Sequence, residues 1–149
     1  MTDTTAHDER YMRMALDEAR RAADEDEVPI GAVIVAADRV VAKAHNLTER
    51  LCDVTAHAEM QAITAASTAL GGKYLSGCTL YVTVEPCVMC AGALAWAQIS
   101  RIVYATPDPK RGFTREAPAC LHPRTRLDSG CLADKASTLI RDFFKHKRQ

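Results

Sequence analysis

The sequence lacks any apolar run long enough to cross a membrane. Its longest such run, residues 28–37, is interrupted by Pro29 and Gly31, whereas a transmembrane helix needs about 18 or more consecutive apolar residues. The first ten residues, MTDTTAHDER, also lack the basic and then apolar pattern of a secretory signal. We therefore expect a cytoplasmic protein that has no membrane partner.

The chain also lacks net charge, because 19 basic residues balance 19 acidic ones. This balance argues against a protein that coats nucleic acid indiscriminately, so recognition of a charged partner must rest on local patches. One such patch lies at the C-terminal end, where Arg141, Lys145, Lys147 and Arg148 accompany the single acidic residue Asp142. Charge alone favours a solvated surface over an RNA contact for such a run.

The length and composition suit a single domain. With 149 residues and 48% apolar side chains, the chain is long enough for one domain, residues 1–149, that buries roughly two-thirds of its unfolded surface.

Cysteine is present, but its pattern does not indicate a disulfide framework. Small disulfide-dense scaffolds belong to oxidising compartments. We expect four of the six cysteines to be free thiols: Cys52, Cys78, Cys120 and Cys131.

The remaining two cysteines belong to the most informative part of the sequence. Cys87 and Cys90 lie in EPCVMCAG, and His57 lies in TAHAE about thirty residues earlier. Cysteine sulfur and histidine nitrogen are ligands that zinc prefers, and a site with three protein ligands keeps a fourth position for water, as catalytic zinc sites do. Glu59 follows His57 by two residues and could transfer protons beside that water.

The local pattern is consistent with a metal site. Residues 80–84 read as a buried strand and residues 88–97 as a helix, with Pro86 at the junction. Residues 58–70 read as a second helix, which Gly71-Gly72 ends. A lone CxxC in a cytosolic chain is often a redox pair, but no thioredoxin-like order of elements surrounds this one. The combination HxE followed by PCxxC is typical of zinc-dependent base deaminases.

The other patterns predict an α/β architecture. Residues 8–23 form an amphipathic helix, residues 28–35 and 40–44 a hairpin, and residues 99–104 a further strand. Alternating strands and helices imply parallel pairing in the second half of the sheet. We expect three α/β/α layers around a mixed sheet of about five strands, and a basic C-terminal helix over about residues 132–148. Gly31 either lets the backbone approach a ligand or marks a bulge.

Residues 106–125 form a long segment with four of the six prolines. Its basic residues outnumber its acidic ones. A loop of about twenty residues in a compact domain is uncommon unless it is functional or disordered. We favour a contact with substrate.

At the HxE and PCxxC motifs the chain resembles the cytidine deaminase-like superfamily and, within it, the bacterial tRNA-specific adenosine deaminases. The resemblance extends from about Tyr11 to Arg148, and the segments that carry it are Glu27–Val35, Asn46, Thr55–Glu59, Thr79–Leu94 and Asp142–Arg148. It implies a cytidine deaminase-like fold and one Zn²⁺ per subunit, held by His57, Cys87 and Cys90.

The resemblance also implies roles for further residues. Asn46 and Asp108 would contact the substrate, the backbone amide of Cys87 would stabilise an oxyanion, and the basic tail (Arg141, Lys145, Lys147 and Arg148) would contact RNA. A homodimer is implied as well, in which Trp96 packs either at the interface or in the core. The expected partner is a tRNA anticodon stem-loop.

The implied reaction converts the wobble adenosine of an anticodon to inosine. Zinc would activate water for attack at C6 of adenine, while Glu59 takes the proton and returns it to the ring nitrogen and then to the departing amine. Free guanine, cytosine or cytidine is the alternative substrate, because the same zinc core serves all of them. A catalytically silent zinc scaffold would lack the glutamate, which is present here.

Overall fold

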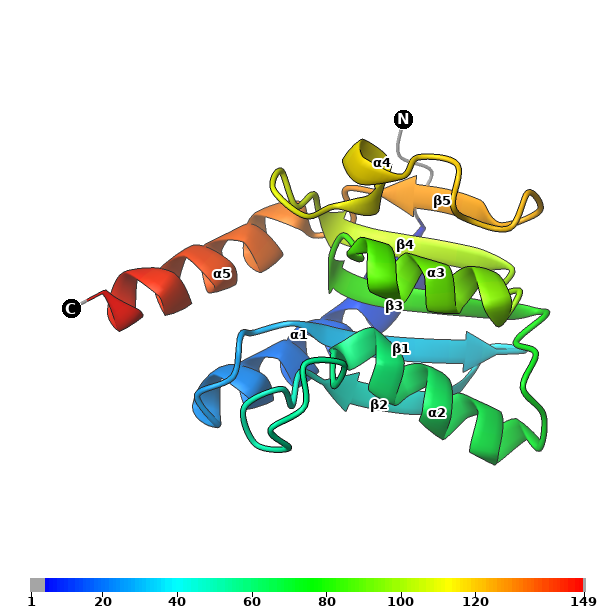
Figure 1. Cartoon of the computed structure of the whole chain (residues 1–149), viewed down its shortest axis with the longest axis horizontal. Coiled ribbons are helices and arrows are strands. Elements are labelled where there is room, and N and C mark those ends of the chain that lie inside the picture. Colours follow the sequence, from blue (N-terminus) through cyan, green and yellow to red (C-terminus); the bar gives the residue numbers. More distant parts are fainter. Residues whose placement is uncertain (1–4, 149) are drawn as a thin grey trace.

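The computed structural model describes residues 5–148. The first four residues, part of the segment in which we expected no secretory signal, lie outside this range, as does the last one. The helices and strands of these residues follow one another in this order (Figure 1): α1 (Ala6–Asp24), β1 (Gly31–Ala36), β2 (Arg39–His45), α2 (Ala58–Leu70), β3 (Cys78–Val84), α3 (Val88–Trp96), β4 (Arg101–Thr106), α4 (Phe113–Glu116), β5 (Arg126–Ser129) and α5 (Ala133–Lys147).

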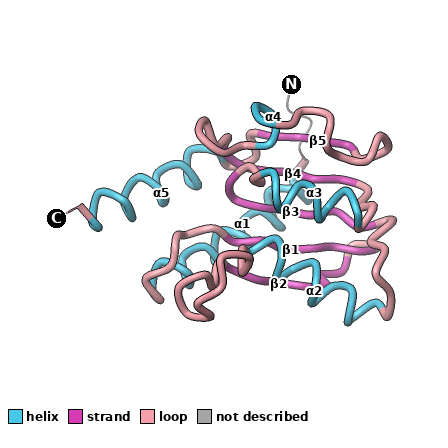
Figure 2. The backbone as a smooth tube through the Cα atoms, in the orientation of Figure 1, coloured by secondary structure: helices cyan, strands magenta, loops and turns pink. Residues whose placement is uncertain are grey.

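The five strands form one mixed sheet in the order β2-β1-β3-β4-β5 (Figure 2). β1 pairs antiparallel with β2 and with β3, whereas β3, β4 and β5 are parallel to one another. The carboxyl ends of the three parallel strands therefore lie at the same edge of the sheet. The predicted mixed sheet and its parallel half are confirmed.

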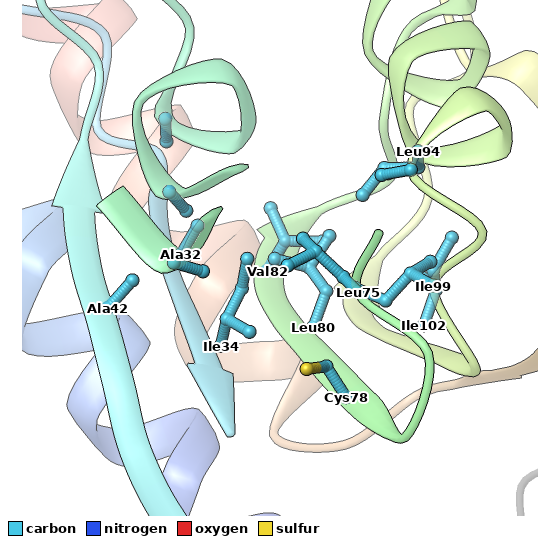
Figure 3. Packing of buried hydrophobic residues seen from close by; sticks show 14 of the residues in the cluster. Ala32, Ile34, Ala42, Leu75, Cys78, Leu80, Val82, Leu94, Ile99 and Ile102 are labelled. Atoms are coloured by element: carbon cyan, nitrogen blue, oxygen red, sulfur yellow. The ribbon is translucent and has the colours of Figure 1, made fainter. Parts of the chain in front are cut away.

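Helices cover both faces of the sheet, as predicted. On one face, small residues of α2 and Leu94 of α3 pack against β1, β3 and β4 (Figure 3). On the other face, Tyr11, Met12 and Leu16 of α1 and Ala136 of α5 pack against the opposite side chains of the same strands. Alternate residues of a strand point to opposite faces, so Val82 and Ile34 join the first cluster while Tyr81 and Val33 join the second.

Local chemistry accounts for several element boundaries. α1 begins with a capping box in which the Thr5 hydroxyl accepts from the Asp8 amide and the Asp8 carboxylate accepts from the Thr5 amide. The hairpin turn places Ala37 and Asp38 at positive φ, as a two-residue turn between twisted strands requires. Gly71 ends α2 in the left-handed conformation at φ 75°.

The expectation that Gly31 marks a bulge was wrong. A Cβ atom at this position would overlap the carbonyl oxygen of Ala15 and crowd the amide of Ala19 in α1. Gly31 therefore lets strand β1 approach helix α1 closely, and the irregularity of register in β1 lies at Ile34 and Val35 instead. The expected strand over residues 99–104 also begins two residues later, at Arg101.

The described residues contain no helix that is long and apolar enough to span a membrane. Cys52, Cys78, Cys120 and Cys131 are free thiols, as expected. α5 lies against the sheet only through its first turns and then projects beyond the carboxyl ends of the parallel strands (Figure 1). The loops around those ends and the exposed length of α5 thus lie on the same side of the molecule.

Candidate metal and active site

Two helix N-termini bring three metal-binding side chains together at the carboxyl end of β3. His57 is the N-cap residue of α2, Cys87 is the N-cap residue of α3, and Cys90 lies in the first turn of α3. The Nδ1 atom of His57 lies 3.6 Å from the Cys87 sulfur and 3.4 Å from the Cys90 sulfur. All three ligand atoms lie within 4.8 Å of one another.

This spacing fits a tetrahedral zinc ion. Zinc binds sulfur at about 2.3 Å and imidazole nitrogen at about 2.0–2.1 Å, so two such ligands at a tetrahedral angle lie about 3.6 Å apart. The two observed nitrogen–sulfur distances, 3.6 and 3.4 Å, match that separation. Within residues 5–148 the cluster has three members, as in catalytic zinc sites that keep one position for water.

The electrostatics of the cluster favour a thiolate before any metal binds. The Cys90 thiol donates to the Cys87 sulfur and lowers the pKa of Cys87 to about 4, an effect that burial opposes and His57 strengthens. The same hydrogen bond and burial raise the pKa of Cys90. The pKa of His57 is raised, chiefly by its hydrogen bond with Cys87. Thiolate is the form of cysteine that binds metal.

Glu59 lies beside the cluster in the first turn of α2 and is 3% exposed. Burial is the main cause that raises its pKa to about 7, and the negative charge near Cys87 adds to the effect. A carboxyl group with a pKa close to neutrality can take up and release a proton at similar cost, which suits a general acid and base. A bound cation would lower this pKa, because it favours the charged carboxylate.

A cavity of about 320 Å³ opens onto these side chains, and we call it the zinc-site cavity. Its lining residues are Ile30, His57, Glu59, Val84, Glu85, Cys87, Asp108 and Arg111. Asp108, which the family resemblance implied as a substrate contact, is one of these lining residues. Asn46 is buried and is not a lining residue, although its backbone N–H donates to the carbonyl of Ile30, which is one. The Asn46 side chain donates to the Thr48 hydroxyl at 3.4 Å.

A larger groove of about 810 Å³, which we call the basic groove, shares Ile30, Val84, Asp108 and Arg111 with the zinc-site cavity. Its far wall is α5. Three of the four expected basic side chains line it, namely Arg141, Lys145 and Arg148. Lys147 is not a lining residue, and its Nζ lies 2.6 Å from Asp26.

Sequence reasoning did not single out two residues of this site. Arg111 lines both the cavity and the groove, but in the sequence it was one of several basic residues in a proline-rich segment. Glu85 belongs to the cysteine motif, yet nothing in the motif indicated that its carboxylate would be buried. The excess of basic residues in residues 106–125 was the available signal for Arg111.

Trp96 is 85% exposed on the outer side of α3, so the expectation that it might pack in the core was wrong. Val88 and Met89 of the same helix are also exposed. α2 contributes Leu70, and Tyr74 follows it, so this side of the molecule presents several large apolar side chains to solvent.

Comparisons with known proteins agree with the geometry. The family model described as the cytidine and deoxycytidylate deaminase zinc-binding region matches residues 5–106. A tRNA-specific adenosine deaminase of Agrobacterium fabrum is 45% identical over 93% of this chain and 94% of its own length.

Solved structures point the same way. One from studies of A-to-I editing by tRNA:A34 deaminases at the wobble position has a TM-score of 0.82 and 44% identity, and covers 87% of this chain and 98% of its own. A guanine deaminase of Bacillus subtilis has a TM-score of 0.64 and 37% identity, and covers 66% of this chain and 64% of its own. The chain therefore belongs to the zinc-dependent cytidine and deoxycytidylate deaminase family and, within it, to the tRNA-specific adenosine deaminases.

Proposed function

We infer that this chain is a zinc-dependent enzyme that hydrolyses adenosine to inosine at the wobble position of a tRNA anticodon loop. The observation that carries this inference is the continuity between the zinc-site cavity and the basic groove. A cavity of this size suits one base, and the groove extends from it past Arg111 to Arg141, Lys145 and Arg148. A free nucleoside would make no use of that extension.

The chemistry assigned to the site divides between the metal and the protein. When zinc is bound, it lowers the pKa of a water ligand from about 15.7 to about 7 and so supplies a nucleophile at neutral pH. Glu59 accepts one proton of the water on its carboxylate and delivers it to the ring nitrogen. It then takes the proton of the hydroxyl group that has formed on C6 and delivers it to the exocyclic amine. The C6–N bond breaks, ammonia leaves, and the base becomes hypoxanthine.

We propose supporting roles for three residues near the cavity. The backbone N–H of Cys87 donates to the oxygen that develops negative charge at C6. Asp108 contacts the flipped nucleotide from the cavity wall. Asn46 reaches the base only if its side chain leaves Thr48, because it is not among the lining residues. Asparagine carries a donor and an acceptor and can therefore read a base edge.

The basic groove is the proposed path of the RNA strand. Arg141, Lys145 and Arg148 would contact phosphates, and Phe144 in the same wall offers an aromatic surface for a base. Lys147 would join them only after its contact with Asp26 opens. An anticodon loop is single-stranded, so extruding its base costs less than flipping one out of a duplex.

We also propose that the chain is a single deaminase domain that forms a homodimer in the cytoplasm. The support for the dimer is the exposed apolar surface of α3, where Trp96, Val88 and Met89 face solvent. Large exposed apolar patches commonly mark protein interfaces, and a second copy of the chain would present the same patch in a two-fold arrangement.

The test is a direct comparison of substrates. Purified zinc-loaded protein is incubated with an anticodon stem-loop that has adenosine at the wobble position, and separately with adenosine, guanine, cytosine and cytidine, while ammonia release is measured. The same stem-loop with its adenosine moved into the paired stem is the matched control. We expect release from the first RNA alone. Turnover of a free base or nucleoside at a comparable or higher rate would contradict the proposal.

A further inference from the structure

Glu85 is a buried carboxylate in a place that the proposed chemistry does not use. It follows the last residue of β3 and lies two residues before the metal ligand Cys87, and it is 4% exposed. Burying an ionised carboxylate is costly unless hydrogen bonds replace its water. The groups that donate hydrogen bonds to the Glu85 carboxylate therefore identify the segment that it holds in place.

Within residues 5–148, three groups donate hydrogen bonds to the Glu85 carboxylate, and all three belong to residues 107–116, which we call the 107–116 loop. The backbone N–H of Asp108 donates to Oε1 at 3.1 Å. Thr114 donates to Oε2 twice, from its backbone N–H at 2.9 Å and from its hydroxyl at 2.6 Å. Hydrogen bonds to an ionised acceptor are about twice as strong as neutral ones.

The backbone around Glu85 is joined to the same loop. The N–H of Phe113 donates to the carbonyl of Pro86 at 3.0 Å, and the Phe113 side chain is 1% exposed. A Cβ atom at Gly112 would overlap the Glu85 carboxyl group. Glycine at position 112 therefore allows the loop to lie directly against the carboxylate.

The 107–116 loop in turn contributes Asp108 and Arg111 to the wall of the zinc-site cavity. Asp108 accepts the backbone N–H of Lys110 at 2.9 Å and that of Arg111 at 3.0 Å on Oδ1, which fixes the turn between them. The position of Arg111 relative to the metal ligands thus depends on where the loop is attached. Glu85 provides that attachment within two residues of Cys87.

We propose that Glu85 positions substrate indirectly. It holds the 107–116 loop against the metal-binding turn, so that Asp108 and Arg111 form one wall of the zinc-site cavity. The proposal rests on the proposed function, because it concerns how RNA is bound. It assigns Glu85 to substrate binding rather than to metal retention or proton transfer, and it predicts that weakening the attachment raises KM for RNA while kcat changes little.

The first test compares variants by kinetics on an anticodon stem-loop with adenosine at the wobble position. We expect Glu85→Gln, which turns an amide NH2 toward donors, to raise KM about 10-fold, and Thr114→Val to raise it about 3-fold, because the competent loop is less populated. Each should keep one zinc per chain and a kcat within about 2-fold of wild type. Thr114→Ser keeps the hydroxyl, so its KM should match that of wild type. The exposed Glu116→Gln is the matched control on the same loop.

The second test needs no activity. Hydrogen exchange at the amides of Asp108 and Thr114, both bonded to Glu85, should accelerate in Glu85→Gln and not in Glu116→Gln. If wild-type protein does not deaminate the stem-loop, the proposed function fails, and this measurement still decides the attachment.

Three results would overturn the proposal. The first is loss of zinc from Glu85→Gln, which would place its role at the metal. The second is a fall in kcat with KM unchanged. The third is wild-type KM and wild-type exchange in both Glu85→Gln and Thr114→Val. If Glu85→Gln does not fold, the KM and hydrogen exchange of Thr114→Val decide between attachment and no attachment. This variant should fold, because it replaces one hydroxyl by a methyl group of similar size at an exposed residue.

Discussion

Asp8 offers a prediction in which pH reports directly on the fold. Its side chain is 3% exposed, and its two oxygens accept Arg101 Nη1 at 2.8 Å and Nη2 at 3.0 Å. The Tyr81 hydroxyl also donates to Oδ1 at 2.7 Å. Burial alone would raise the pKa of Asp8, but the hydrogen bonds from Arg101, Tyr81 and Thr5 outweigh it and lower the pKa from 3.8 to about 2.

This difference can be converted into a free energy of unfolding. A gap from 3.8 to about 2 makes the ionised form contribute about 2 kcal/mol at neutral pH. Because the folded-state pKa is the lower one, the contribution is complete above the unfolded value and is lost as pH falls toward the folded value. About 1 kcal/mol should remain at pH 3 and almost none below pH 2.

The assay is urea unfolding of wild type and Asp8→Asn between pH 7 and pH 2. Protonation of the zinc ligands affects both proteins equally, so the difference between them isolates Asp8. We expect this difference to shrink by about 1 kcal/mol between pH 7 and pH 3. Glu9→Gln, at an exposed neighbour paired with Arg13, should change stability by less than about 0.5 kcal/mol. A cost of Asp8→Asn that is the same at pH 7 and pH 3 would refute the reasoning.

Three further predictions follow from other parts of the molecule. Gly31→Ala should lower the free energy of unfolding by about 1–3 kcal/mol in calorimetry, because the added Cβ meets the backbone of α1. The control is Gly72→Ala, whose added Cβ has nothing within 4 Å and whose stability should be close to that of wild type. Trp96→Glu should convert the proposed dimer to monomer in sedimentation without loss of thermal stability, and an unchanged sedimentation coefficient would exclude this surface. Replacing Lys145 and Arg148 by Ala should reduce the dependence of log affinity for the RNA stem-loop on log salt by about 2, whereas an unaltered slope would remove these residues from the RNA path.

The elements that the sequence predicted well are those whose ends carry their own chemical signal. Residues 58–70 were predicted as a helix and α2 occupies them, because glycine in a left-handed cap ends a helix through local interactions alone. The cluster of metal-binding side chains could also be predicted from the sequence, because a proline, two cysteines at helical spacing and a histidine limit the possible geometry.

The features that the sequence could not predict depend on distant contacts. β5 is Arg-Leu-Asp-Ser at the edge of the sheet, and four mostly polar residues carry no strand pattern without the neighbour that pairs with them. Gly31 is required by a helix that precedes it in the chain. Trp96 was expected either at a dimer interface or in the core, and the sequence could not show that its helix would turn it away from the core. The buried charge of Glu85 likewise exists only because the 107–116 loop folds back on it.

Inosine formation by Glu59→Ala of known zinc content tests the central claim most directly. Wild type and variant, each assayed for bound metal, are incubated with transcribed tRNA that has adenosine at the wobble position, and the products are sequenced for A-to-G changes. We expect one zinc per chain in both proteins, conversion by wild type, and at least about 100-fold slower conversion by the variant. Conversion at the wild-type rate by Glu59→Ala, or by wild-type protein stripped of metal, would contradict the account.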